Sequence, residues 1–339
     1  MITRSAKLSQ IKLVYIWVLL ILVTLCFQNC DLNKLHDSTA SSYRPGKLLF
    51  KSNFGTGVNV EALSGYNSTG TGAWRYLSGT DQETGFSWDD IGVGENYAAI
   101  QYITFEPVTP TNIGDYIESG IRPVIGPHGN LVNELYQYVK KKSPVGEGGS
   151  QAPLVINRPW DKGDVNDFYI SYWYKHQADL VTQLDSTVSS GNWRAQFGFK
   201  TGGYLNSWEG DYRIGTGILK GTDNKLYWYT KGDNVANGPW ERVDYWKVEN
   251  HEVPVPIDTW FKYEAYWHRS GGGDGRYWSA VNGQIIVDYH GPIMGDYNLP
   301  INRIFIVNPY SGGSPVVESH MTELEIWDGF PCGDGQPCY

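Results

Sequence analysis

The sequence has little methionine and little positive charge, and both shortages narrow its possible structure and partners. Only 3 of its 339 residues are methionine, whereas 14 Trp, 24 Tyr and 11 Phe make it rich in aromatic residues. Aromatic side chains are enriched in β-strands, so this balance favours β-structure over a helical bundle. Lys and Arg number 27 against 36 Asp and Glu, which gives a formal net charge of −9. Such a protein is repelled by phosphate backbones, so we expect no nucleic-acid partner unless a local basic patch overrides the mean charge. A polyanionic substrate would need such a patch too.

Motifs for several common chemistries are also missing. The sequence contains no phosphate-binding loop, no Ser/His/Asp motif and no spacing of zinc ligands. No fixed-period repeat is present either, which favours a β-sandwich over a propeller or solenoid. With 41% apolar and 19% charged residues, the composition is that of a globular protein rather than a disordered or collagen-like one. One large β-domain fits this length.

Residues 1–30 have the pattern of an export signal. Three cations, Arg4, Lys7 and Lys12, precede the apolar run of residues 13–27, which is the order found in signal peptides. An uncleaved anchor is the alternative, because the charge-free run of residues 13–30 is just long enough to span a bilayer. The segment resembles a bacterial lipoprotein signal, since its apolar run ends at Cys26 and Cys30 and a polar tether follows. We favour Cys30 over Cys26 as the lipidated residue, which implies a membrane partner and an exported protein at the outer membrane or cell surface, or a secreted one.

The other two cysteines, Cys332 and Cys338, lie in the C-terminal sequence CGDGQPC. In an exported protein this spacing favours a disulfide-closed terminal loop. A metal-binding pair is the alternative, but no His or third Cys lies nearby in sequence to complete a zinc site.

Alternation of residue types predicts strands most clearly in the second half of the sequence. Residues 168–175 and 261–268 alternate aromatic or apolar residues with polar and aromatic ones, and the Asn282-Gly283 dipeptide predicts a two-residue type I′ hairpin turn. Residues 193–200 alternate in the same way, and residues 131–142 fit a short crossover helix.

Three segments resemble a known fold family. In residues 254–292 a Trp opens a strand, a Gly/Asp-rich loop follows, and a hairpin with Asn-Gly at its tip comes next. Residues 321–330, MTELEIWDGF, read as a closing strand, and residues 199–210, FKTGGYLNSWEG, as a glycine-rich turn after a central strand. Together they resemble concanavalin A-like jelly-roll polysaccharide lyases of the heparin-lyase and glucuronan-lyase type.

The resemblance implies an all-β fold, a jelly-roll β-sandwich over residues 47–331, and a monomer. Residues 1–30 would precede it as the signal or anchor and residues 31–46 as a flexible tether, with residues 332–339 as the closed tail. Because this fold is shared by lectins, hydrolases and lyases, the activity has to come from a site.

Elimination next to a uronate needs three kinds of group: one that neutralises the C6 carboxylate, a base for the C5 proton, and an acid for the leaving oxygen. In residues 193–200 the alternation places one amide and two cations together on the polar face. The candidate neutralising groups are Arg194, Gln196 and Lys200. The candidate base is His268, and the candidate acid is Tyr266. Each is also compatible with the solvated face of an ordinary strand.

Further polar and aromatic residues are candidates for contacting a polysaccharide in a concave groove. They are His176, Tyr174, Tyr227, Tyr229, Lys231 and Trp208. Among them, His176 is a second candidate for the base, and Tyr227 and Tyr229 are further candidates for the acid; the two tyrosines are equally compatible with a packed sheet surface.

The leading hypothesis is therefore a lyase acting on an anionic uronate polysaccharide, and a non-catalytic glycan-binding lipoprotein is the alternative. A glycoside hydrolase is a weaker hypothesis. Glu323, Glu325 and Asp328 resemble a retaining β-glucanase motif, but polar outward positions of a final strand explain these residues better. The jelly-roll resemblance also implies one structural calcium ion, with Asn53 and Glu323 as candidate ligands, and no other cofactor.

Overall fold

The computed structural model describes most of the protein beyond residue 44. The described residues are 45–64, 72–91, 97–103, 109–140, 152, 154–157, 167–187, 191–201, 212–234, 243–294, 301–306 and 316–332. They all belong to one compact unit, Arg44–Tyr339. Among the described residues no helix has the length and apolar character required to cross a membrane.

The described part of the protein is almost entirely β-structure. Its strands are β1 (Leu48–Ser52), β2 (Asn59–Val60), β3 (Gly72–Ser78), β4 (Tyr97–Ile103), β5 (Ile117–Ile125), β6 (Leu131–Val139), β7 (Leu154–Asn157), β8 (Asp167–His176), β9 (Trp193–Thr201), β10 (Tyr212–Lys220), β11 (Leu226–Asn234), β12 (Val243–Asn250), β13 (Phe261–His268), β14 (Arg276–Val281), β15 (Gln284–His290), β16 (Ile301–Ile306) and β17 (Val317–Trp327). The short helices are η1 (Trp88–Asp90), η2 (Ile113–Asp115) and α2 (Leu180–Gln183).

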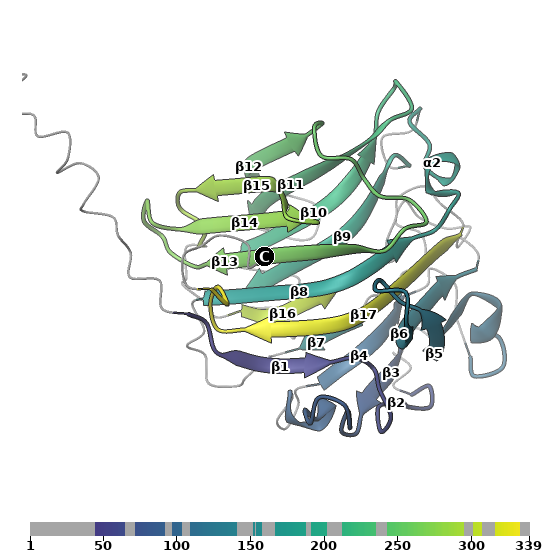
Figure 1. The fold of residues 1–339 in the computed structure, drawn as a ribbon. Helices are drawn as coiled ribbons and strands as arrows, with labels where there is room; N and C mark the ends of the chain where they lie inside the picture. The colour runs from purple at the N-terminus through teal and green to yellow at the C-terminus, as the bar shows by residue number, and fades with distance from the viewer. Residues whose placement is uncertain are drawn as a thin grey trace, which may run out of the picture. The chain divides into compact units, whose positions relative to one another are not determined.

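The strands form two antiparallel sheets. The eight-stranded sheet has the order β15-β14-β13-β8-β17-β6-β5, with β1 also paired to β17. The nine-stranded sheet has the order β12-β11-β10-β9-β16-β7-β4-β3-β2. Figure 1 shows the first described strand, β1, lying beside the last, β17. The prediction of an all-β sandwich is confirmed.

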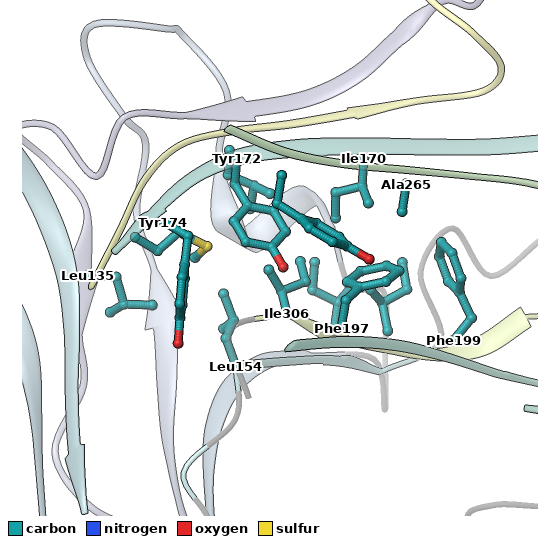
Figure 2. Packing of buried hydrophobic residues seen from close by; sticks show 14 of the residues in the cluster. Leu135, Leu154, Ile170, Tyr172, Tyr174, Phe197, Phe199, Ala265 and Ile306 are labelled. Carbon is teal, nitrogen blue, oxygen red and sulfur yellow. The ribbon is translucent and has the colours of Figure 1, made fainter. Parts of the chain in front are cut away.

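The core lies between the two sheets and is rich in aromatic rings. Phe168 of β8 meets Phe199 of β9 with ring centroids 5.8 Å apart, and Phe197 meets Tyr263 of β13 at the same separation. Figure 2 shows side chains of both sheets facing one another, among them Ile170, Tyr172, Leu154, Phe197, Phe199 and Ile306. The alternation predicted for residues 168–175 and 261–268 is confirmed, because Phe168, Ile170, Tyr172, Tyr174, Phe261, Tyr263, Ala265 and Trp267 are all buried in this core.

Two local predictions have opposite outcomes. The Asn282-Gly283 turn is confirmed, since both residues have positive φ (46° and 75°) and join β14 to β15, as a type I′ turn requires. The helix predicted at residues 131–142 is wrong, because residues 131–139 form β6 and pair with β5. Apolar residues at 131, 135 and 139 are four apart, and that spacing fits a helix face and alternate strand positions equally well. Pairing with β5 and β17 decides for the strand.

A β-bulge in β9 changes which side chains face the core. Thr216 of β10 pairs with Phe197, but the next residue, Gly217, pairs with Ala195. The extra residue in β9 reverses the alternation on one side of the bulge. As a result Arg194 faces the core together with Phe197, whereas Lys200 keeps its predicted position on the outer face.

Candidate functional site

Three basic side chains lie in one row across the outer face of the nine-stranded sheet. Lys200 of β9 is opposite Arg213 of β10 on one side and opposite Arg303 of β16 on the other. We call these three residues the basic row. Like charges at directly opposed positions destabilise a sheet, so this arrangement favours a role in binding an anion.

Carboxylates hold one end of the basic row in place. Arg213 makes a bidentate ion pair with Asp233 of β11, and its Nε lies 2.8 Å from Asp233 Oδ1. Lys231 also contacts Asp233, at 3.2 Å, and reaches Asp244 at 2.8 Å. Burial alone would raise the pKa of Asp233, but the Arg213 hydrogen bond and the charges of Arg213 and Lys231 lower it. Asp233 is therefore ionised and fixes the Arg213 guanidinium.

The other end of the basic row rests on an aromatic ring. The Lys200 ammonium lies 4.6 Å from the centroid of Phe305, and the Arg303 guanidinium lies 5.7 Å from the same centroid. Arg303 is nearly buried, with 6% of its surface exposed. These cation–π contacts orient both cations. Little water surrounds Arg303, and charges attract one another more strongly where water is excluded.

Next to the basic row the sheet has an open position with no side chain. Gly215 of β10 pairs with Gly198 of β9 and with Lys231 of β11. A Cβ atom built on Gly215 would have no atom within 4 Å, so the space above it is open. Lys200 and Phe305 lie on one side of this position and Lys231 on the other. We call it the Gly215 platform.

Tyr229 of β11 lies beside the platform. It is opposite Gly217 of β10, and a Cβ on that glycine would come within 2.6 Å of Tyr229 Cε1. The Tyr229 ring therefore lies over Gly217, rather than projecting perpendicular to the sheet. This places a phenol on the same face of the sheet as the basic row, with the Gly215 platform between them.

The remaining predicted residue of this face, Tyr227, lies further along β11. Its ring packs on His251 with centroids 4.0 Å apart, and His251 Nε2 lies 3.4 Å from Glu249. The pKa of Tyr227 is raised by partial burial and by the nearby charges of Asp223 and Glu249. Lys200, Tyr227, Tyr229 and Lys231 therefore all lie on the outer face of the nine-stranded sheet.

Four other predicted residues do not line any surface. Arg194, Gln196, Tyr174 and His176 each have 0% of their surface exposed. Gln196 donates to the hydroxyl of the core residue Tyr172 at 3.2 Å. The prediction that Arg194 and Gln196 line a groove is wrong, because the β9 bulge interrupts the alternation on which it relied. Tyr174 and His176 are on the inward face of β8, so they also cannot contact a polysaccharide in this structure.

His268 and Tyr266 lie on the opposite sheet, on the outer face of β13. His268 Nδ1 is 2.8 Å from Asp167 Oδ1, and the Tyr266 hydroxyl donates to the same carboxylate. Tyr266 is fully buried because Phe330 covers it, with ring centroids 4.4 Å apart. The structure therefore does not bring this His/Tyr pair together with Lys200, since the two sheets separate them.

The His268 ion pair predicts a pH-dependent contribution to stability. The hydrogen bond to Asp167 raises the pKa of His268 above its usual 6.5, against the opposing effect of burial. Because the folded pKa exceeds the unfolded one, the stabilisation is complete below about pH 6 and is lost as the pH rises through the folded pKa. We expect His268→Gln to destabilise the protein at about pH 5.5 and to have little effect at about pH 9. Urea unfolding of both proteins at the two pH values would measure this, and an equal loss at both would contradict it.

The predicted calcium ligands are neighbours in the structure. Each makes a contact with another side chain, and Asn53 Oδ1 is buried without a hydrogen-bond partner among the described residues. Ser52 of β1 pairs with Leu324 of β17, which places Asn53 beside Glu323. Asn53 Nδ2 donates to Glu83 at 3.2 Å, and Glu323 lies 3.4 Å from His128. Within the described residues no group of three or more His, Cys, Asp and Glu could hold a metal ion. The calcium ion stays a prediction.

The carboxylates of the hydrolase hypothesis each have their own contact. Glu325 pairs with Lys51 at 2.8 Å, and Asp328 accepts a hydrogen bond from the backbone of Lys47. Trp208, Cys30 and Cys338 lie outside the described residues. The lipid anchor and the pairing of Cys332 with Cys338 therefore stay predictions.

Comparison with known proteins finds distant likenesses to solved structures. No family model and no curated protein matches the sequence. Among solved structures, alginate lyase Aly36B has 13% sequence identity and a TM-score of 0.42 over 79% of this chain and 97% of its own. A variant of that enzyme in complex with alginate tetrasaccharide has 16% identity and a TM-score of 0.41 over 61% of this chain and 82% of its own.

The endo-β-1,4-glucuronan lyase of the fungus Trichoderma reesei has 11% identity and a TM-score of 0.45, over 63% of this chain and 90% of its own. These structures are of alginate and glucuronan lyases. At such low similarity the neighbours do not assign an activity to this protein.

Sequence reasoning missed two members of the basic row, Arg213 and Arg303. Both stand in alternating segments, but 90 residues separate them, and only the register of β10, β9 and β16 places them on either side of Lys200. The open position at Gly215 was missed as well. A glycine inside a strand, where it weakens the strand, was the available signal for a close approach of another molecule.

Proposed function

We propose that this protein is a polysaccharide lyase that cleaves a uronate-containing glycan by β-elimination on the outer face of the nine-stranded sheet. The observation that carries the proposal is the basic row of Arg213, Lys200 and Arg303, set in register beside the open Gly215 platform. A carboxylate on each sugar is the anion that such a row suits, and a platform without side chains admits a flat sugar ring.

The reaction assigns a role to each side chain. Lys200 and Arg303 bind the C6 carboxylate and stabilise the negative charge that develops when the C5 proton leaves. Tyr229 acts as both base and acid: its phenolate takes the C5 proton, the electron pair forms the C4–C5 double bond, and the C4–O4 bond breaks. The leaving O4 receives a proton from the tyrosine hydroxyl. The products are a 4,5-unsaturated uronate end and a new reducing end.

The elimination itself provides the test. The full-length protein is mixed with a panel of uronate polysaccharides that includes alginate and glucuronan, and the ultraviolet absorbance of the new unsaturated ends is followed. We expect absorbance to rise on at least one polymer and to stay flat on neutral glucans. Retention of a polymer on an affinity gel without any rise in absorbance would overturn the lyase and leave a glycan-binding protein.

Filling the Gly215 platform should block the reaction without harming the fold. Gly215→Val adds a side chain into open space, so we expect the free energy of unfolding to change by no more than about 0.5 kcal/mol. The rate of elimination should fall about 100-fold or more, because a displaced sugar loses its alignment with the reacting groups.

The matched control for this substitution is Gly120→Val on β5. Gly120 also has no atom within 4 Å of a built Cβ, but it lies on the other sheet. We expect this variant to keep full activity. Equal activity of Gly215→Val and the control would show that the sugar does not bind over the platform.

A further inference from the structure

A small polar group lies buried between the two sheets. Tyr174 and His176 project from β8 with ring centroids 4.7 Å apart, and Arg194 projects from β9 towards them. All three side chains have 0% of their surface exposed. Figure 2 shows Tyr174 directing its hydroxyl away from β8 into the space between the sheets.

Most of the polar atoms in this group have no partner. Arg194 Nη1 donates to Gln177 Oε1 at 2.9 Å, and that oxygen also accepts the backbone N–H of Glu318. Within the described part of the protein, Nε and Nη2 of Arg194 and both ring nitrogens of His176 have no hydrogen-bond partner. Buried donors almost always have one, and a buried guanidinium is especially unfavourable without one.

No buried carboxylate of the described residues compensates this charge. Asp233 pairs with Arg213 and Lys231, and Glu134 pairs with Arg122 and His320. Two further buried carboxylates also have their own partners: Glu264 accepts from Tyr169 and contacts Lys262, and Asp81 accepts from Ser52 and from backbone N–H groups.

The charge of the group is a single positive one. Burial lowers the pKa of Arg194 to about 10, so the guanidinium remains charged at neutral pH. Burial, and then the charge of Arg194, lowers the pKa of His176 well below 6.5, so the imidazole is neutral. Asp179, an exposed carboxylate that accepts from Gln177 Nε2 at 2.7 Å, also attracts the Arg194 charge, but it makes no direct hydrogen bond to Nε or Nη2 of Arg194.

We propose that a monovalent inorganic anion of halide size binds between the sheets, against Nε and Nη2 of Arg194. The Tyr174 hydroxyl and one N–H of His176 are the further donors. One anion balances the one positive charge, whereas a water molecule would satisfy hydrogen bonds and leave the charge. The rings of Phe261 and Trp228, whose centroids lie 5.3 and 6.5 Å from that of His176, favour a small and weakly hydrated ion. The anion joins β8 of one sheet to β9 of the other.

Stability in different salts tests the proposal. The full-length protein is unfolded in sodium chloride, bromide and gluconate at equal ionic strength and pH, since gluconate is too large for the site. The folded-to-unfolded ratio should rise about 100-fold when the halide concentration is about 100 times its Kd, and gluconate should give no such rise. Crystals soaked in bromide should show an anomalous peak beside Arg194.

Two variants separate the anion site from a structural role of the arginine. Arg194→Met removes the charge, so it should abolish the difference between halide and gluconate while remaining folded in gluconate. The matched control is Arg276→Met, which breaks a partly buried bidentate pair with Asp288. It should lower stability in every salt and keep the halide dependence. If Arg194→Met does not fold, Tyr174→Phe serves instead and should weaken the halide dependence.

Three results would contradict the proposed anion site. They are equal stability of the unsubstituted protein in halide and gluconate, ordered water without a bromide peak beside Arg194, and an undiminished halide dependence in Arg194→Met or, if that does not fold, in Tyr174→Phe.

Discussion

Replacing Lys200 with methionine should lower kcat for elimination about 10²- to 10³-fold, the loss expected when one stabilising group for a developing oxyanion is removed. Methionine keeps most of the side-chain length and can still pack on Phe305, which lies 4.6 Å from the ammonium. The fold should therefore be retained, so that the decrease in kcat measures the effect of removing the positive charge. Lys200→Arg should recover part of the rate because it restores the cation.

Lys175→Met is the matched control for the loss of a cation over a ring. Its ammonium lies 5.9 Å from the centroid of Trp260, and its side chain is 24% exposed. It projects from β8 of the other sheet, so we expect full activity. The initial rates of Lys200→Met, Lys200→Arg and Lys175→Met are measured from the ultraviolet absorbance of the unsaturated ends and compared with that of the unsubstituted protein. If Lys200→Met kept the full rate, the basic row would not neutralise the substrate carboxylate.

Replacing Tyr229 with phenylalanine should lower kcat about 10²- to 10⁴-fold, because it removes a proton-transfer group. The phenylalanine ring can still lie over Gly217, where a Cβ would meet the tyrosine ring at 2.6 Å. Binding of the polysaccharide should therefore change little, and KM should stay within a few-fold of its original value.

Tyr245→Phe is the control for Tyr229→Phe. Tyr245 lies on the neighbouring strand β12, stacks on Tyr212 and is 49% exposed. Its loss of a hydroxyl should leave kcat unchanged. If Tyr229→Phe raised KM and left kcat unchanged, Tyr229 would contribute to binding, and another residue of this face would transfer the proton.

The proposed function requires an acidic protein to bind an anionic polymer, and the local charge on the nine-stranded sheet is compatible with this. The formal net charge is −9, yet the basic row sets three cations side by side on one sheet. Their attraction for a carboxylate acts over a few ångström, whereas the mean charge acts through solvent and is screened over about 8 Å at physiological salt. The acidic mean charge therefore does not conflict with the proposed binding at the basic row.

The sequence by itself determined the class of fold and the inward faces of several strands. Strict alternation in residues 168–175 and 261–268 could be read directly, because successive side chains of a strand point to opposite faces. Asn282-Gly283 could be read for a similar reason, since both turn residues need positive φ and this dipeptide tolerates it. These signals are local, so no tertiary contact was needed to interpret them.

Tertiary structure alone decided the site. A single extra residue in β9 turned Arg194 into the core and left Lys200 outside, and a bulge of this kind depends on pairing with β10. The basic row joins residues 200, 213 and 303 through the register of three strands, which no local pattern specifies. The same physical reason separated His268 from Lys200: both stand on outward faces, but of different sheets, and the sheet to which a strand belongs is set by long-range pairing.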